Sequence, residues 1–120
     1  MTFHRLLAAA ALGIAVAAAP VAALAHARLV ASTPAAGTTV AAPERISLTF
    51  SERVVPAFSG FDLVDAAGRE VAVRATVSED GKTLSARLAR PLAAGAWTVN
   101  WRIASGDGHR MTGSYGFTVR

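Results

Sequence analysis

The sequence contains no cysteine. Without thiols the chain can form no disulfide bond, and neither thiolate metal ligation nor cysteine catalysis is open to it. Its stability must therefore come from side-chain packing, alone or together with a bound metal. A domain of about 100 residues can still fold without disulfides.

A concentrated basic surface is lacking as well. The formal net charge is +4, and its arginines are scattered singly along the chain. No run or helical stripe of Lys and Arg would follow a phosphate backbone. The sequence therefore predicts that the protein does not bind nucleic acid.

After the first 25 residues, no segment shows the 3.6-residue period of an amphipathic helix over three turns. Apolar and polar residues alternate instead, most clearly over 46–50, 97–103 and 115–119, and also over 71–77. Asp80-Gly81 marks a tight hairpin. About seven such segments predict an all-β fold, an Ig-like Greek-key β-sandwich or barrel of antiparallel strands.

The first 25 residues form a segment of another kind. A positive charge at Arg5 precedes an alanine-rich apolar run, and the segment ends in Ala23-Leu24-Ala25, which fits the signal-peptidase rule. A transmembrane helix is the alternative, but the run falls short of the roughly 20 strongly apolar residues that a bilayer span needs. We expect a cleavable signal peptide at 1–25 and one domain at 26–120, exported to the periplasm or the cell exterior. Cleavage would make His26 the first residue.

A polar, glycine-rich loop is expected at 105–113, between the two clearest strands. It contains Asp107 and His109, and the loops at one end of a sandwich could bring them near an N-terminal His26. The amine and Nδ1 of His26 would close a six-membered chelate on a metal ion. Three nitrogens and one oxygen, without sulfur, suit Cu(II). Gly106 and Gly108 could both take dihedrals that other residues avoid and so aim the two side chains.

Each of these features also has a plainer explanation. A loop histidine is most often simply solvated, an Asp-Gly pair is common turn chemistry, and the position of His26 could be an accident of the leader boundary. Zinc could occupy the site in place of copper. The residue types alone leave these alternatives open.

Several motifs together resemble the CopC copper-resistance family, in the family's order and over essentially all of residues 26–120. These motifs are H-A (His26-Ala27), S-x-P-A-x-G (Ser32, Pro34, Ala35, Gly37), L-x-F-S-E (Leu48, Phe50, Ser51, Glu52), W-x-V-x-W-R (Trp97, Val99, Trp101, Arg102) and S-x-D-G-H-x-x-x-G-x-x-x-F (Ser105, Asp107, Gly108, His109, Gly113, Phe117).

The resemblance implies a periplasmic or exported β-sandwich that binds one Cu(II) ion for sequestration, resistance or delivery, and that is not an enzyme. It places the metal ligands at His26, through amine and imidazole, and at Asp107 and His109. It also implies a CopD-like membrane permease as a partner, and neither nucleic acid nor a small-molecule substrate. After the leader is removed, Met111 is the one methionine left. A methionine-rich Cu(I) site is therefore not expected, and Met111 is expected to pack in the loop.

The remaining motif residues are expected to act structurally. Trp97 and Trp101 should lie in the core, and Glu52 and Arg102 should pair or support the loop from behind. Two other functions stay open. One is a copper oxidase that holds its metal with an N-terminal histidine and a second imidazole, and the other is a metal-free sandwich module that binds a protein partner.

Overall fold

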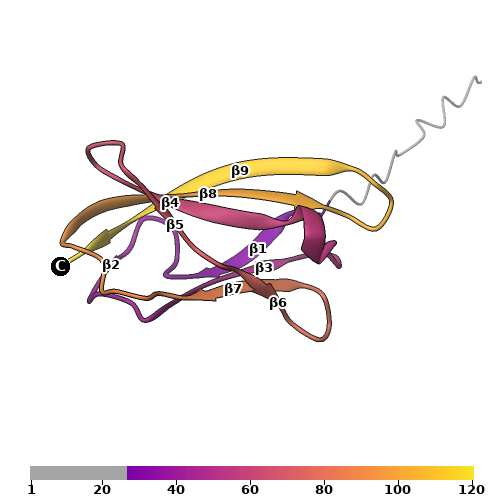
Figure 1. Cartoon of the computed structure of the whole chain (residues 1–120), viewed down its shortest axis with the longest axis horizontal. Helices are drawn as coiled ribbons and strands as arrows, with labels where there is room; N and C mark the ends of the chain where they lie inside the picture. Colours follow the sequence, from indigo (N-terminus) through magenta and orange to yellow (C-terminus); the bar gives the residue numbers. More distant parts are fainter. Residues whose placement is uncertain (1–26) are drawn as a thin grey trace, which may run out of the picture.

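The computed structural model describes residues 27–120, and within them nine strands form two sheets. The four-stranded sheet has the order β1-β3-β7-β6 and contains β1 (Leu29–Thr33), β3 (Arg45–Phe50), β7 (Thr83–Arg87) and β6 (Thr76–Val77). The five-stranded sheet has the order β2-β9-β8-β4-β5 and contains β2 (Thr39–Val40), β9 (Arg110–Val119), β8 (Gly95–Ala104), β4 (Gly60–Asp65) and β5 (Glu70–Ala72). A single 3₁₀ turn, η1 (Pro56–Phe58), precedes β4. The two sheets lie face to face (Figure 1).

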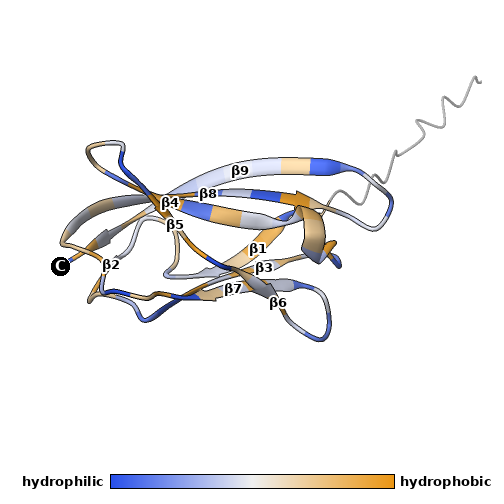
Figure 2. Ribbon diagram, in the orientation of Figure 1, coloured by the Kyte–Doolittle hydropathy of each residue, from blue (hydrophilic) through white to orange (hydrophobic). Residues whose placement is uncertain are grey.

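The core forms between the sheets because successive side chains of a strand point to opposite faces. On β3, Ile46, Leu48 and Phe50 point inward, and each is at most 1% exposed. From β8, Trp97 is buried against them and Trp101 is half-buried. The ring of Trp101 stands edge-on to that of Phe50, with 5.2 Å between the centroids. Polar and apolar residues alternate along the strands in Figure 2, as this packing requires.

The expected fold class, an all-β sandwich, is confirmed. The structure has nine strands where about seven were expected, because β2 and β6 are only two residues long. Among the strands of residues 27–120, all pairings are antiparallel except that of β2 with β9. In the part of the chain that the structure describes, no helix has the length and apolar character needed to cross a membrane.

The alternating segment at 71–77 differs from the prediction of one continuous strand. It divides into β5, which pairs with β4 in the five-stranded sheet, and β6, which pairs with β7 in the other sheet. Val73 and Ala75 lie on the crossing between them and still pack against the core. The side chains of Val73 and Ala75 still point inward, although the strand with which the chain pairs changes from β4 to β7.

The β8–β9 hairpin is the longest unit of the fold. Each strand has ten residues, and their pairing runs from Gly95 and Val119 at one end to Ala104 and Arg110 at the other. The connection between them is the tight turn 105–109, so it is shorter than the predicted loop at 105–113. This turn lies at one end of the sandwich, the end at which the described chain begins (Figure 1).

Candidate metal centre

The β8–β9 turn, residues 105–109, is held by hydrogen bonds within itself. The Ser105 N–H donates to the carbonyl oxygen of His109 over 2.9 Å, and the Gly108 N–H donates to the carbonyl oxygen of Ser105 over 3.0 Å. Asp107 Oδ1 accepts from the Ser105 hydroxyl and, over 3.0 Å, from the His109 N–H. Ser105 is buried and anchors the turn, whereas Asp107 and His109 are exposed.

The two predicted side chains on this turn lie against each other. Asp107 Oδ2 is 2.9 Å from His109 Nδ1, and both side chains are a little over half exposed, at 56% and 55%. Hydrogen bonds from the Ser105 hydroxyl and from the His109 N–H hold the pKa of Asp107 well below its usual range, with a smaller contribution from the imidazole. The carboxylate is therefore ionised at neutral pH. When Nδ1 of the neutral ring carries the proton, the lone pair of Nε2 is the one that a metal ion can take.

A second turn in the chain, residues 78–82 between β6 and β7, has the same S-x-D-G pattern and three matching hydrogen bonds, although its Ser78 N–H donates to Thr83 and not to the fifth residue of the turn. Asp80 Oδ1 accepts from the Ser78 hydroxyl over 2.5 Å and from the Lys82 N–H over 3.0 Å, and the Gly81 N–H donates to the Ser78 carbonyl over 2.9 Å. Gly81 has φ +75°, and Gly108 in the β8–β9 turn has φ +88°. The two turns are structural counterparts.

The comparison of the two turns shows which properties of Asp107 come from the turn itself and which are specific to the candidate site. The pKa of Asp80 is also lowered, and again the serine hydroxyl is the largest cause and the backbone N–H two residues later is the next. The lowered pKa of Asp107 therefore follows from the turn itself and is not a mark of metal binding. The difference lies at the fifth position, where the β8–β9 turn has His109 and its counterpart has Lys82.

The start of the described chain is fixed at the same end of the sandwich. Ala27 is buried in the core at 1% exposure. The next residue, Arg28, exchanges two hydrogen bonds with Ser51: its N–H donates to the Ser51 hydroxyl over 3.0 Å, and its carbonyl oxygen accepts from the Ser51 N–H over 2.9 Å. Three residues after Ser51, Val54 forms an antiparallel bridge with Ser105. The segment after β3 thus connects the first described residues to the base of the β8–β9 turn.

The structure brings together two of the three predicted site residues, Asp107 and His109. The third, His26, lies outside the described residues. Within residues 27–120, no group of three or more His, Cys, Asp or Glu side chains could enclose a metal ion. A site built on this turn therefore needs further donors from elsewhere, and the prediction assigns them to His26.

Residues around the turn depart from one expectation and satisfy another. Arg102 Nη1 pairs with Asp62 Oδ2 on β4 at 3.0 Å and not with Glu52. Met111 is half-buried and has a packing role as expected, but it lies on β9 and packs against the core, not in the loop. Sequence reasoning did not identify Phe58 of η1, which is 57% exposed and carries the Arg110 guanidinium 5.3 Å from its ring centroid. It also missed the anchoring role of the Ser105 hydroxyl, although the second S-x-D-G pattern was a signal for it.

Replacing Gly108 with alanine is expected to destabilise the protein by about 1–2 kcal/mol, because a residue with a Cβ is disfavoured at positive φ. A Cβ added at Gly108 or at Gly106 would have no atom within 4 Å, and only Gly108 has positive φ. The prediction that both glycines could take dihedrals that other residues avoid therefore holds for Gly108 and is wrong for Gly106. Gly106→Ala is the matched control and should change the free energy of unfolding little. Urea titrations measure both, and equal losses would contradict a conformational cause.

Comparison with known proteins gives consistent results. The sequence model of the CopC domain matches residues 29–120. Copper resistance protein C of Pseudomonas syringae pathovar tomato is 48% identical in an alignment of length 103 that covers 80% of this chain and 82% of that protein. Copper resistance protein C of Xanthomonas campestris pathovar juglandis is 37% identical in an alignment of length 105 that covers 82% of this chain and 83% of that protein.

Two solved structures resemble the fold at similar identities. CopC from Methylosinus trichosporium OB3b superposes with a TM-score of 0.73 at 36% identity, over 78% of this chain and 93% of that one. PcoC, a methionine-rich copper resistance protein from Escherichia coli, superposes with a TM-score of 0.72 at 39% identity, over 79% of this chain and 99% of that one.

Proposed function

This chain belongs to the CopC family, and on that basis we propose that it is an exported protein that binds one Cu(II) ion. The proposed ligands are the amine and imidazole of His26, the imidazole of His109 and the carboxylate of Asp107. The observation that carries the proposal is the Asp107–His109 pair, held on a hydrogen-bonded turn at the end of the sandwich where the described chain begins.

The donor set favours Cu(II) over other ions. It has nitrogen and oxygen atoms only, and Cu(II) prefers tetragonal coordination by such ligands and has the highest affinity in the divalent series. The Asp107 carboxylate is ionised at neutral pH and contributes negative charge. The relatives are named copper resistance proteins, which supports copper as the cargo.

The proposal of Cu(II) and not Cu(I) rests on the methionine content of the chain. One structural relative is described as methionine-rich, whereas this chain has two methionines, Met1 and Met111. Met1 belongs to the proposed leader, and Met111 packs against the core. A Cu(I) site made of thioethers therefore lacks its ligands, and the proposal is limited to Cu(II).

The proposed role is to sequester or carry copper in the periplasm or outside the cell, without turnover. Asp107 would take a coordination position that an oxygen-activating copper site leaves open. A CopD-like membrane permease is the proposed partner in copper transfer.

An N-terminal extension tests the proposal directly. One alanine added before His26 in the 26–120 protein converts the amine into an amide and removes the chelate. We expect the Cu(II) affinity to fall by roughly 100-fold or more, since even changes to groups behind metal ligands cost 10–100-fold. Competition titration with a chelator of known affinity measures this.

The matched control is the same alanine added after Arg120, at the other terminus, which should leave the affinity unchanged. The mass of the exported protein shows whether cleavage occurs before His26. Equal affinity of the extended and unextended proteins would exclude the amine as a ligand and refute the site as proposed.

A further inference from the structure

A cavity lies at the opposite end of the sandwich from the β8–β9 turn. It has a volume of ≈ 950 Å³ and opens between β5, the end of β7, the connection 88–94 and the first residues of β8. β8 has ten residues between this cavity and the turn, so the two are roughly 30 Å apart at about 3.3 Å per residue. A ligand in the cavity would not touch the proposed copper site.

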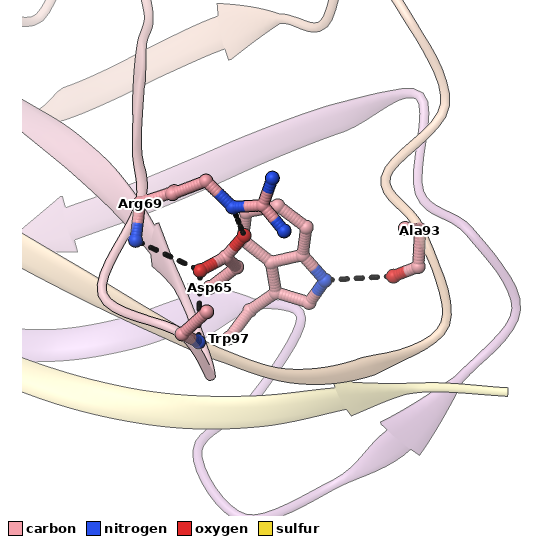
Figure 3. Close-up of polar contacts among 5 residues, drawn as sticks. Asp65, Arg69, Ala93 and Trp97 are labelled. Atoms are coloured by element: carbon pink, nitrogen blue, oxygen red, sulfur yellow. Dashed lines mark hydrogen bonds and ion pairs between the residues drawn. The ribbon is translucent and has the colours of Figure 1, made fainter.

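The wall of the cavity is largely apolar. Val71, Val73, Leu88, Leu92 and Trp97 contribute to its lining. The Trp97 indole N–H donates to the Ala93 carbonyl oxygen over 2.8 Å, which fixes the ring and uses its one polar atom (Figure 3). Val71 is 38% exposed although it is a large hydrophobic residue. Apolar cavities of about 300–1,000 Å³ with a few polar groups are typical of small-molecule sites.

The lining of the cavity contains four arginines and two carboxylates, so arginines outnumber acidic residues there. Asp65 is engaged within its own turn, since Oδ1 accepts from the N–H groups of Ala67 and Arg69 and Oδ2 lies 3.3 Å from Arg69 Nε (Figure 3). Glu70 is the other carboxylate at the cavity.

Three more arginines line the cavity, and all three are exposed, namely Arg74, Arg87 and Arg90. Within residues 27–120, none of these three forms an ion pair. Arg87 also stands opposite Arg45 in the β3–β7 register, and like charges in that position repel. An anion at the cavity would relieve this excess of positive charge.

We propose that the cavity binds a small amphiphilic carboxylate, such as a fatty acid, whose apolar body lies on Trp97 and the valine and leucine side chains. Its carboxylate is held by Arg87 and Arg90, because guanidinium groups bind carboxylates through paired, charge-assisted hydrogen bonds. The concave shape favours an inserted small molecule over a membrane surface. The sequence suggested no ligand of this class.

The test uses dodecanoate below its micellar concentration and the metal-free 26–120 protein. We expect saturable one-to-one binding by calorimetry, with movement of the Trp97 indole N–H signal in NMR spectra and none of the Trp101 signal. Dodecyltrimethylammonium has the same chain and the opposite charge, and it should bind at least tenfold more weakly. Arg87→Gln/Arg90→Gln should weaken dodecanoate binding at least tenfold.

Arg28→Gln/Arg53→Gln is the control, because it removes two charges at the far end and should leave dodecanoate binding unchanged. Binding should also be the same with and without Cu(II), so this test does not depend on the copper proposal. Absence of saturable binding, equal binding of the cationic amphiphile, or an unaffected Arg87→Gln/Arg90→Gln variant would each overturn the proposal.

Discussion

Replacement of His109 with alanine is expected to lower the Cu(II) affinity of the 26–120 protein by roughly 100-fold or more, because it removes one of the two imidazoles of that chain. The fold should be unaffected, since the side chain is exposed at the tip of a turn and such substitutions usually change stability by about 0.5 kcal/mol or less. Competition titration gives the affinity, and urea unfolding of the metal-free proteins checks the fold.

The counterpart turn at 78–82 provides a control for the carboxylate. Asp107→Asn and Asp80→Asn both disturb the hydrogen bonds that the carboxylate accepts from the serine hydroxyl and from the N–H two residues later. Asp107→Asn also removes the contact with His109 Nδ1, so it should reduce stability at least as much as Asp80→Asn. Only Asp107→Asn should also weaken Cu(II) binding. Loss of Cu(II) affinity in both Asp107→Asn and Asp80→Asn would show that the weaker binding results from lower stability. Unchanged Cu(II) affinity in His109→Ala would show that the turn is not part of the metal site.

The strands were predictable because their inward and outward faces follow a two-residue period in the sequence. Ile46, Leu48 and Phe50 are buried as the period requires, and the Asp80-Gly81 turn forms where the dipeptide predicted it. Periodicity states which way a side chain points. It does not state which strand lies alongside, and this explains the error at 71–77.

At 71–77, the inward residues keep their period while the chain leaves one sheet and enters the other. The change is set by the neighbours, since β4 offers its free edge to β5 and β7 offers its edge to β6. The two-residue β2 was missed for a similar reason, because its parallel pairing with β9 depends on the fold bringing them together.

The candidate site was predictable in part. The sequence indicated Asp107 and His109, and their contact follows from local turn geometry. Two properties needed the structure. One is that the Asp107 bonds recur at Asp80, which assigns them to the turn. The other is that the Arg28–Ser51 and Val54–Ser105 contacts fix the first described residues and the turn at one end. The role of His26 remains a proposal that rests on cleavage of the leader.

Gly113→Ala is expected to be the most destabilising single-methyl addition in the β8–β9 hairpin. A Cβ at this position would meet the Trp101 ring, with Cε2 at 2.6 Å, a separation that real Cβ atoms do not show. Trp101 cannot withdraw freely because its ring packs edge-on against Phe50, which is 1% exposed. Overpacking of this kind costs about 1–3 kcal/mol, which corresponds to a Tm lower by roughly 4–8 °C for each kcal/mol in a domain of this size. Differential scanning calorimetry measures it.

Gly116→Ala, three residues farther along β9, is the matched control. Its Cβ would meet only the Trp97 carbonyl oxygen at 3.4 Å, an ordinary contact, and alanine is better than glycine in a strand, so stability should stay the same or rise. A double-mutant cycle identifies the cause of the Gly113→Ala effect. In a Trp101→Leu background the ring is gone, and the Gly113→Ala penalty should largely disappear. A penalty of the same size in both backgrounds would show that the ring is not responsible. The glycine of the D-G-H-x-x-x-G pattern would then require an explanation other than space for the tryptophan.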